Sequence, residues 1–175
     1  MNGKTHILGG LTFGVLGATF TESLPGASVN EIIPFALFLG SCTTGAILPD
    51  IDKRKTKISS KHPIVSFFIR IFTTHRGITH SPFLYIIITG ILASIYFIDK
   101  NIWSYYIFAG ISLGYASHLF LDMLNPKGIP LFYPICNKRF NLLNITTGGI
   151  IERILYVSFI FIDYLLVKNM VLAMI

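Results

Sequence analysis

The stretch SPFLYIIITGILASIYFIDKNIWSYYIFAGISLGYASHLFLDML, residues 81–124, decides the fold class of this chain. It contains two apolar runs, residues 82–98 and 102–124, which are separated by the polar triplet DKN. A transmembrane helix needs about 20 predominantly apolar residues, so each run is long enough to cross a bilayer. The stretch therefore predicts a hairpin of two membrane-spanning helices.

The rest of the chain has the same apolar character. Hydrophobic residues make up 53% and charged residues 13% of the sequence, and the mean hydropathy is +0.67; these values lie outside the range of soluble globular domains. Three further apolar runs cover residues 7–20, 32–48 and 154–175. We therefore predict an all-α integral membrane bundle of about five spans. The number falls to four if the short first run is re-entrant or buried. No repeat or linker divides residues 1–175, which indicates a single domain.

The distribution of positive charge predicts the orientation. Residues 49–81 carry half of the 14 Lys and Arg residues, and such loops stay in the cytoplasm. With five spans, this choice places the N-terminus inside and leaves only Lys100 and Lys168 outside. The net charge of +6 then reflects this bias and contact with anionic lipids, not nucleic-acid binding. Residues 59–72 predict an interfacial helix, and residues 125–149 an irregular cytoplasmic loop with short strand pairing around IPLFYP.

Histidines and carboxylates collect at the same predicted membrane boundary, at the cytoplasmic ends of the spans. These residues are His6, Asp50, Asp52, His75, His80, His118, Asp122 and Glu152. His118 and Asp122 are four positions apart and share one helical face. Imidazole and carboxylate ligands suit zinc, with manganese or iron as alternatives, and the cluster is large enough for one or two ions. In the competing interpretation, His118 and Asp122 only hydrogen-bond each other and a neighbouring helix.

The motif HRGITHSP, residues 75–82, adds features that a phosphate site needs. Ser81 and Pro82 form an N-cap and first-turn pair for the third span. The start of that helix would present free amide groups, and Arg76 would supply a forked anion donor beside it. The alternative is that Arg76 is a membrane anchor and Ser81 only a cap.

Four motifs carry a family resemblance: THILGG, LPDID, HRGITHS and SHLFLDMLNPKGIPLFYP, in this order among hydrophobic spans. They resemble the YdjM-type family of inner-membrane metal-dependent hydrolases, some of which are LexA-regulated. That family is distantly similar to zinc-dependent phospholipase C and P1-type nucleases, which cleave phosphoesters with clustered metal ions. The resemblance implies a multi-pass protein of the bacterial inner membrane. It also implies a ligand set of His6, Asp50, His75, His80, His118 and Asp122, with Asp52 and Glu152 as further candidates. The dense histidine pattern of the soluble phospholipases is missing from this sequence.

We therefore expect a membrane-bound metal-dependent hydrolase that cleaves a phosphoester of a lipid or another amphiphile at the cytoplasmic boundary. Asp50 or Asp52 would act as general base, while Arg76 and the helix start at Ser81 would hold the phosphoryl group. Two alternatives remain open. One is a non-catalytic membrane protein with a structural metal, which binds a cytosolic partner through the basic residues 53–61. The other is a metal-ion transporter, whose ligands would lie near the bilayer midplane.

Overall fold

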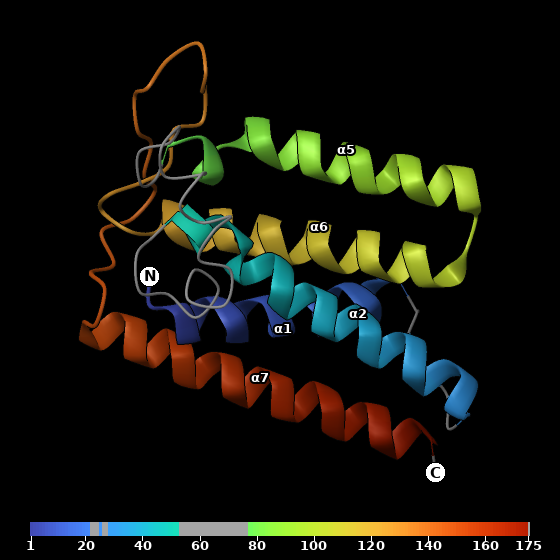
Figure 1. Ribbon diagram of the computed structural model, residues 1–175. Coiled ribbons are helices and arrows are strands. Elements are labelled where there is room, and N and C mark those ends of the chain that lie inside the picture. The colour runs from blue at the N-terminus through green and yellow to red at the C-terminus, as the bar shows by residue number, and fades with distance from the viewer. Residues whose placement is uncertain (22–24, 26–27, 53–76, 175) are drawn as a thin grey trace.

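The computed structural model describes residues 1–21, 25, 28–52 and 77–174. Within them, the chain folds into helices and connecting loops (Figure 1). The elements are α1 (Gly3–Phe20), α2 (Val29–Ile47), η1 (Leu48–Asp52), η2 (Ile78–His80), α5 (Pro82–Asp99), α6 (Ile102–Met123) and α7 (Ile150–Met174), of which η1 and η2 are short 3₁₀ helices. The predicted all-α class is confirmed, and each α-helix coincides with one predicted apolar run.

Side-chain caps fix the boundaries of the central hairpin. Ser81 accepts a hydrogen bond from the Leu84 amide at the start of α5, as the sequence predicts. Lys100 ends that helix in the left-handed region at φ 48°, and the Asn101 side chain then accepts the Trp103 amide at the start of α6. Because a cap satisfies an amide that a helix start would otherwise leave unpaired, a two-residue turn is enough to reverse the chain.

Among the described residues, two helical segments are long and apolar enough to cross a membrane by length and composition: Asn30–Asp52 and Pro82–Asp99. Helix α5 has no buried residue in the structure, and large apolar side chains such as Ile86 and Phe97 are exposed on it. An exposed apolar surface of this kind suits contact with lipid tails and would be a liability in water.

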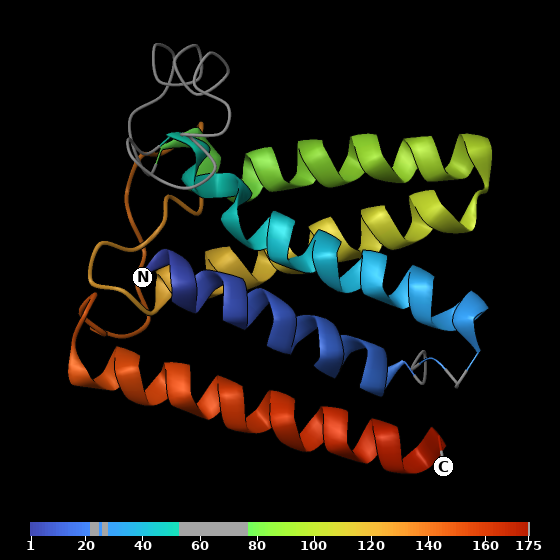
Figure 2. The ribbon, with the colours of Figure 1, turned by 60° about the horizontal axis from the view of Figure 1, so that its bottom comes forward.

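Helices α1, α2 and α6 form the inner part of the bundle, with α5 packed on α6 and α7 packed on α1 (Figure 2). Small residues allow the inner helices to approach closely. A Cβ atom at Gly114 of α6 would overlap the Cys42 carbonyl oxygen of α2, and one at Gly10 of α1 would meet Ala46. Close backbone contact through small residues is the usual way in which membrane helices associate.

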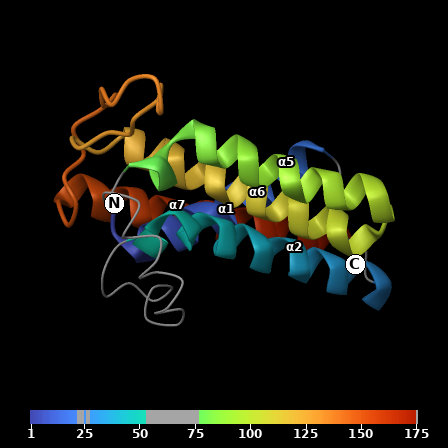
Figure 3. The ribbon, with the colours of Figure 1, turned by 45° about the horizontal axis from the view of Figure 1, so that its top comes forward.

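One end of the bundle collects segments that are far apart in sequence. The N-terminus, η1, η2, the end of α6, the start of α7 and the loop of residues 124–149 all lie there (Figures 1 and 3). The loop is held by one isolated antiparallel bridge between Ile129 and Phe140, which falls at the predicted strand pairing. The Asn125 side chain also donates to the Ile145 carbonyl. The predicted interfacial helix at residues 59–72 lies outside the described residues.

Candidate metal centre

Three histidines and three aspartates meet at this end of the bundle, from α1, η1, η2 and α6. Each is exposed by 8% or less: His6, Asp50, Asp52, His80, His118 and Asp122. Ionisable side chains are costly to bury without partners, so such a cluster needs a compensating arrangement. Six of the eight residues that sequence analysis assigns to a metal site are therefore brought together.

Two groups of side chains within the cluster could each hold a metal ion. The first is His6, His118 and Asp122, and the second is Asp50, His80 and His118. Within each group, the ligand atoms all lie within 4.8 Å of one another. His118 belongs to both groups, so the cluster offers either one ion site with alternative ligands or two adjoining sites. Nitrogen and carboxylate oxygen donors in this number suit zinc.

A hydrogen bond between helices orients the shared histidine. The Nδ1 atom of His118 lies 2.6 Å from the Ala46 carbonyl oxygen of α2. Because a carbonyl oxygen can only accept, Nδ1 must be the protonated nitrogen of the ring. The lone pair of a neutral imidazole then lies on Nε2, which faces the cluster. A second hydrogen bond of this kind is the usual support of a metal-binding histidine.

His80 is oriented by a chain of polar contacts. The Thr79 hydroxyl donates to the Asp52 carboxylate at 2.6 Å and lies 3.0 Å from Nδ1 of His80. Since its one hydrogen points to Asp52, the hydroxyl accepts from His80, which again leaves Nε2 of that ring to face the cluster. Tyr115 of α6 donates to the Thr79 carbonyl and fixes the backbone of η2. Asp52 therefore supports a ligand and lies behind it.

Asp122 lies at the centre of the cluster. One of its oxygens accepts from the Met1 amine at 2.6 Å and lies 3.3 Å from Nε2 of His6. The other oxygen is 3.6 Å from Nε2 of His80 and 3.7 Å from Nε2 of His118. These two separations exceed an ordinary N–H···O distance. The rings of His80 and His118 thus converge on the carboxylate without donating to it at close range.

Unsatisfied buried atoms show that the cluster fits a cation. Nδ1 of His6 and Nε2 of His118 are buried, and neither makes a hydrogen bond with any residue that the structure describes. Most buried side-chain polar atoms in proteins have a partner. Nε2 of His118 faces Asp122 at 3.7 Å, so a divalent ion bound by this nitrogen and by the carboxylate would satisfy it, and the donor set present here fits the metal that the sequence predicts.

Glu152, the remaining described ligand candidate, has a different environment. Its two carboxylate oxygens accept the backbone amides of Asn2 and Gly148, at 2.6 Å and 2.5 Å, and it belongs to neither ligand group. Burial raises the pKa of this carboxyl, but hydrogen bonds from the two backbone amides and from Thr5, together with the N-terminal charge, hold the pKa below its ordinary value. Glu152 thus joins the start of α7 to the start of α1.

The other predicted site residues are placed as follows. The Ser81 hydroxyl donates to the Ile78 carbonyl and accepts the Leu84 amide, so it acts as a cap. His75 and Arg76 lie outside the described residues. Sequence analysis missed Thr79, Tyr115 and the Ala46 carbonyl, which hold the two histidine rings. The only sequence signal for Thr79 is its position directly before His80.

Comparison with known proteins adds a family to this geometry. Residues 1–174 match the family described as YdjM inner membrane protein. Uncharacterized protein YvsG of Bacillus subtilis (strain 168) is 34% identical over 154 residues, which cover 88% of this chain and 86% of that protein. Inner membrane protein YdjM of Escherichia coli (strain K12) and its Shigella flexneri namesake are each 33% identical over 146 residues, 81% of this chain and 69% of theirs.

No solved structure matches this chain. The names of the relatives and the two apolar helices together support a location in the bacterial inner membrane. The match extends over the whole described bundle, including every residue of the two ligand groups. The chain belongs to the YdjM inner membrane protein family.

Proposed function

We propose that this chain is a membrane-bound metal-dependent hydrolase that cleaves a phosphoester of a lipid or another amphiphile. The observation that carries the proposal is the pair of ligand groups that share His118. Metal clusters are a common device of phosphoester hydrolysis, because they act on both the attacking and the leaving oxygen. The distant similarity to phospholipase C and P1-type nucleases that the family resemblance implies would agree with this reaction type, as an analogy between sites.

The proposed ligands are His6, His118 and Asp122 for one ion, and Asp50, His80 and His118 for a second ion or an alternative position. A bound divalent ion would supply a Lewis acid and lower the pKa of a bound water. The protein's own groups do the remaining work. Asp52 and Thr79 hold the ring of His80 in place. With a single ion on His6, His118 and Asp122, Asp50, at 8% the most exposed of the six, is the proposed general base.

The phosphoryl group would be held from the side of η2 and α5. In this proposal, Arg76 remains the anion donor that the sequence predicts, and it directly precedes Gly77 at the start of the described segment. Ser81 contributes by capping α5, since its hydroxyl already has partners in Ile78 and Leu84. The role of Ser81 is thus to shape the helix start and not to react.

We further propose five spans, with the N-terminus and the metal centre on the cytoplasmic side. The distribution of cations supports this orientation. Lys4, Arg153 and the loop residues Lys127, Lys138 and Arg139 belong to segments at the metal-centre end, whereas Lys100 lies in the turn between α5 and α6 at the opposite end (Figure 1). Short loops that carry Lys and Arg residues are retained on the cytoplasmic side of the membrane. A substrate that reaches this boundary by lateral diffusion would be an amphiphile.

A second candidate function is a structural metal site in a non-catalytic membrane protein. The burial of all six clustered residues favours it, because structural zinc sites are closed and catalytic sites keep an open position. Its partner would be a cytosolic protein bound through residues 53–61. A metal-ion transporter is less well supported, since its ligands should lie near the middle of the membrane, and these lie at one end.

The test combines metal analysis with a substrate screen on purified protein. Asp122→Asn should lower the bound zinc and abolish hydrolysis of phospholipid or phosphodiester substrates. Asp163→Asn is the matched control. Asp163 is also a buried acid, but its carboxylate accepts a hydrogen bond from the Thr12 hydroxyl at 3.0 Å. Thr12 is six residues after His6 on α1, or about 9 Å away along the helix axis at 1.5 Å per residue. This control should keep both the metal and the activity.

The three possible functions give different results in this test. Metal that depends on Asp122, together with hydrolysis that depends on Asp122, supports the hydrolase. Metal without turnover on any phosphoester in the screen favours the structural site. Uptake of zinc into sealed vesicles that contain the protein would favour the transporter. Equal metal content in the wild type, Asp122→Asn and Asp163→Asn would contradict the shared centre.

A further inference from the structure

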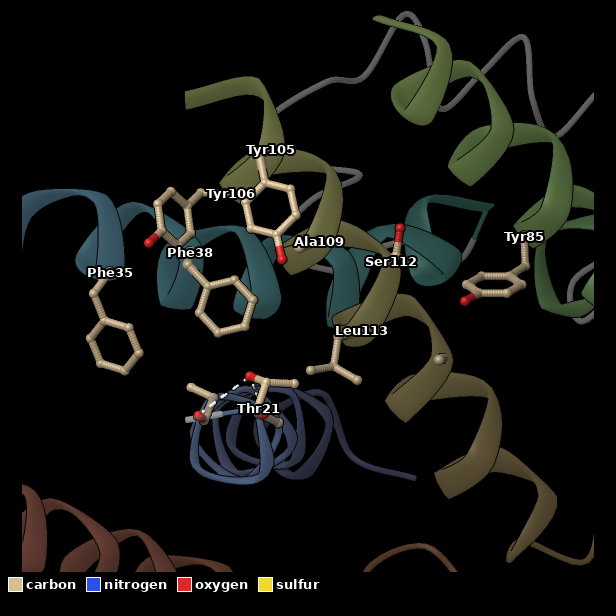
Figure 4. Close-up of a pocket in the computed structure, with 12 residues that line it drawn as sticks. Thr21, Phe35, Phe38, Tyr85, Tyr105, Tyr106, Ala109, Ser112 and Leu113 are labelled. Atoms are coloured by element: carbon tan, nitrogen blue, oxygen red, sulfur yellow. Dashed lines mark hydrogen bonds between the residues drawn. The ribbon is translucent and has the colours of Figure 1, made fainter. Parts of the chain in front are cut away.

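A cavity of about 380 Å³ lies among α1, α2, α5 and α6 (Figure 4). Its wall is mainly apolar and aromatic, and includes Phe35, Phe38, Tyr106, Ala109 and Leu113. Sites for small molecules in proteins have volumes of about 300–1,000 Å³ and combine an apolar wall with a few polar groups. The cavity therefore has the size and the character of a site for an apolar ligand or for the apolar part of an amphiphile.

The cavity is elongated along α6. Its lining on this helix runs from Tyr105 to Ala116, which corresponds to about 16 Å at 1.5 Å per residue. Half of the roughly 30 Å hydrocarbon core of a bilayer is about 15 Å. The lined length thus equals the depth of one leaflet, which is the space that a single acyl chain occupies when it lies parallel to the helices.

One end of the cavity lies at the level of the metal centre along α6. Ala116 precedes His118 by two positions, or about 3 Å along the helix axis. Tyr85 of α5, which lines the same end, packs against Tyr115 with ring centroids 5.7 Å apart. The Tyr115 hydroxyl in turn donates to the carbonyl of Thr79, next to His80. A molecule with its polar group at the centre could therefore extend an apolar tail past Tyr85 and Tyr115 into the cavity.

A polar atom lines the part of the wall that is nearer the metal centre. The Oγ atom of Ser112 is buried and makes no hydrogen bond with the residues the structure describes. Ser112 lies between Ala109 and Ala116 on α6, and the Tyr85 side chain points toward the cavity close to it (Figure 4). Buried hydroxyls are normally paired. An ester carbonyl at the head of an acyl chain would accept from Ser112, while the methylenes beyond it contact Phe38 and Phe35.

The surrounding helices leave a route for lateral entry. Helix α5 packs against α6 and η2, and among the described elements it makes no comparable contact with α1 or α2. The side of the cavity between α5 and these helices is therefore not closed by helix packing. In a membrane protein, this side faces lipid, so an acyl chain can enter without crossing water.

We infer that this cavity binds the acyl chain of a membrane phospholipid whose phosphate lies at the metal centre. The inference rests on the proposed hydrolase function and assigns its substrate to the diacyl phospholipids. In the reaction, the oxygen of water bonds to phosphorus, the ester P–O bond breaks, and the proton from water ends on the leaving alcohol. No further reactant is required.

The decisive variant is Ala109→Phe, which fills the cavity about 14 Å along α6 from His118 and leaves the part near the metal centre open. Ala36→Phe is the matched control, because Ala36 is an exposed residue on α2 and is not among the lining residues. Both variants are compared with the wild type for hydrolysis of dihexanoyl and dipalmitoyl phosphatidylglycerol in detergent.

Binding is measured separately, on protein stripped of metal so that no turnover is needed. The probe is a long-chain phosphatidylglycerol with a diazirine at mid-chain, in vesicles of phosphatidylethanolamine and phosphatidylglycerol. After irradiation, mass spectrometry maps the labelled peptides. We expect wild type and Ala36→Phe to be labelled at Phe38 and Leu113, and Ala109→Phe to lose this labelling.

The expected result is a change in chain-length preference. Ala109→Phe should lose activity on the dipalmitoyl lipid and retain it on the dihexanoyl lipid, whereas Ala36→Phe should keep both. If Ala109→Phe misfolds, it loses both activities. In that case Ser112→Ala, a smaller change in the same wall, provides the test and should weaken the labelling. Unchanged labelling in Ala109→Phe and Ser112→Ala would overturn the inference. If labelling depends on the cavity but no phospholipid is hydrolysed, the cavity binds an acyl chain and the proposed hydrolase function fails. The assignment of phospholipids as substrates is then overturned with it.

Discussion

The Nδ1 atom of His118 on α6 lies 2.6 Å from the Ala46 carbonyl oxygen on α2, and this contact determines how the shared ligand can act. It leaves the other ring nitrogen unprotonated and directed at Asp122. Ala46 is also the residue that a Cβ atom at Gly10 would meet. The orientation of the ligand therefore depends on the same close packing of the inner helices that stabilises the fold.

Because His118 belongs to both ligand groups, its loss should remove more metal than the loss of a residue from one group. We expect His118→Ala to retain less zinc than either His6→Ala or Asp50→Asn. Elemental analysis of the purified variants, normalised to protein, measures this difference. A zinc content in His118→Ala equal to that of both single-group variants would contradict a shared ligand.

Thr79 connects Asp52 to His80, and replacing its hydroxyl should affect both stability and metal binding. Thr79→Val keeps the shape but removes the hydroxyl that donates to the buried Asp52 carboxylate, at a cost of about 1–3 kcal/mol of unfolding free energy. Loss of an outer partner of this kind also weakens metal binding by about 10–100-fold. Thr79→Ser retains the hydroxyl and should restore both properties. Competition with a zinc chelator measures the affinity, and thermal unfolding in detergent measures the stability.

The close contact between α2 and α6 at Gly114 predicts a strong effect of one methyl group. Gly114→Ala would place a Cβ atom against the Cys42 backbone, and the resulting overpacking should cost about 1–3 kcal/mol. Gly90→Ala is the matched control, since nothing lies within 4 Å of a Cβ atom there. Within a helix, alanine is more stable than glycine by about 0.5–1 kcal/mol. Thermal unfolding should show a lower midpoint for the first variant and an unchanged or higher one for the second. Equal midpoints would mean that α2 and α6 separate more easily than the structure indicates.

The two native cysteines provide the starting point for a test of orientation. Cys136 is exposed in the loop at the metal-centre end, whereas Cys42 is fully buried. A membrane-impermeant maleimide should therefore label Cys136 in inverted vesicles and leave it unlabelled in right-side-out vesicles. Lys100→Cys, at the opposite end, should show the reverse pattern. Labelling of Cys136 from the outer face would contradict the N-in topology.

The sequence predicted the helices well, because a long apolar run can hardly form anything else in a membrane. It also predicted that His6, Asp50, His80, His118 and Asp122 share one depth, since they lie at the ends of successive helices that run in opposite directions. Depth alone does not determine which side chains touch. That depends on the rotation of each helix, which here is set by close contacts such as Gly114 against Cys42.

Glu152 and Asp52 have partners that residue type and spacing did not predict. Glu152 has the right depth and chemistry for a ligand, yet its carboxylate binds the amides of Asn2 and Gly148. Its partners depend on the turn at Gly148, where φ is +80°, and on the start of another helix. Asp52 resembles Asp50 in sequence, but its position two residues further along the 3₁₀ helix turns it toward Thr79. Neither distinction is visible in residue type or spacing.

The ligands of the candidate metal centre do not all belong to the same part of the bundle: four lie on inner elements, and one precedes the outer helix α5. His6, His118 and Asp122 lie on α1 and α6, and Asp50 lies in η1 directly after α2, so all four belong to the tightly packed inner part. His80 alone among the grouped ligands precedes α5, a helix with no buried residue. His80 is nevertheless joined to the inner part, because Tyr115 of α6 donates to the Thr79 carbonyl and the Thr79 hydroxyl donates to Asp52 of η1. Four of the five grouped ligands therefore belong to the packed inner helices, and the fifth is connected to them through the hydrogen bonds of its neighbour Thr79.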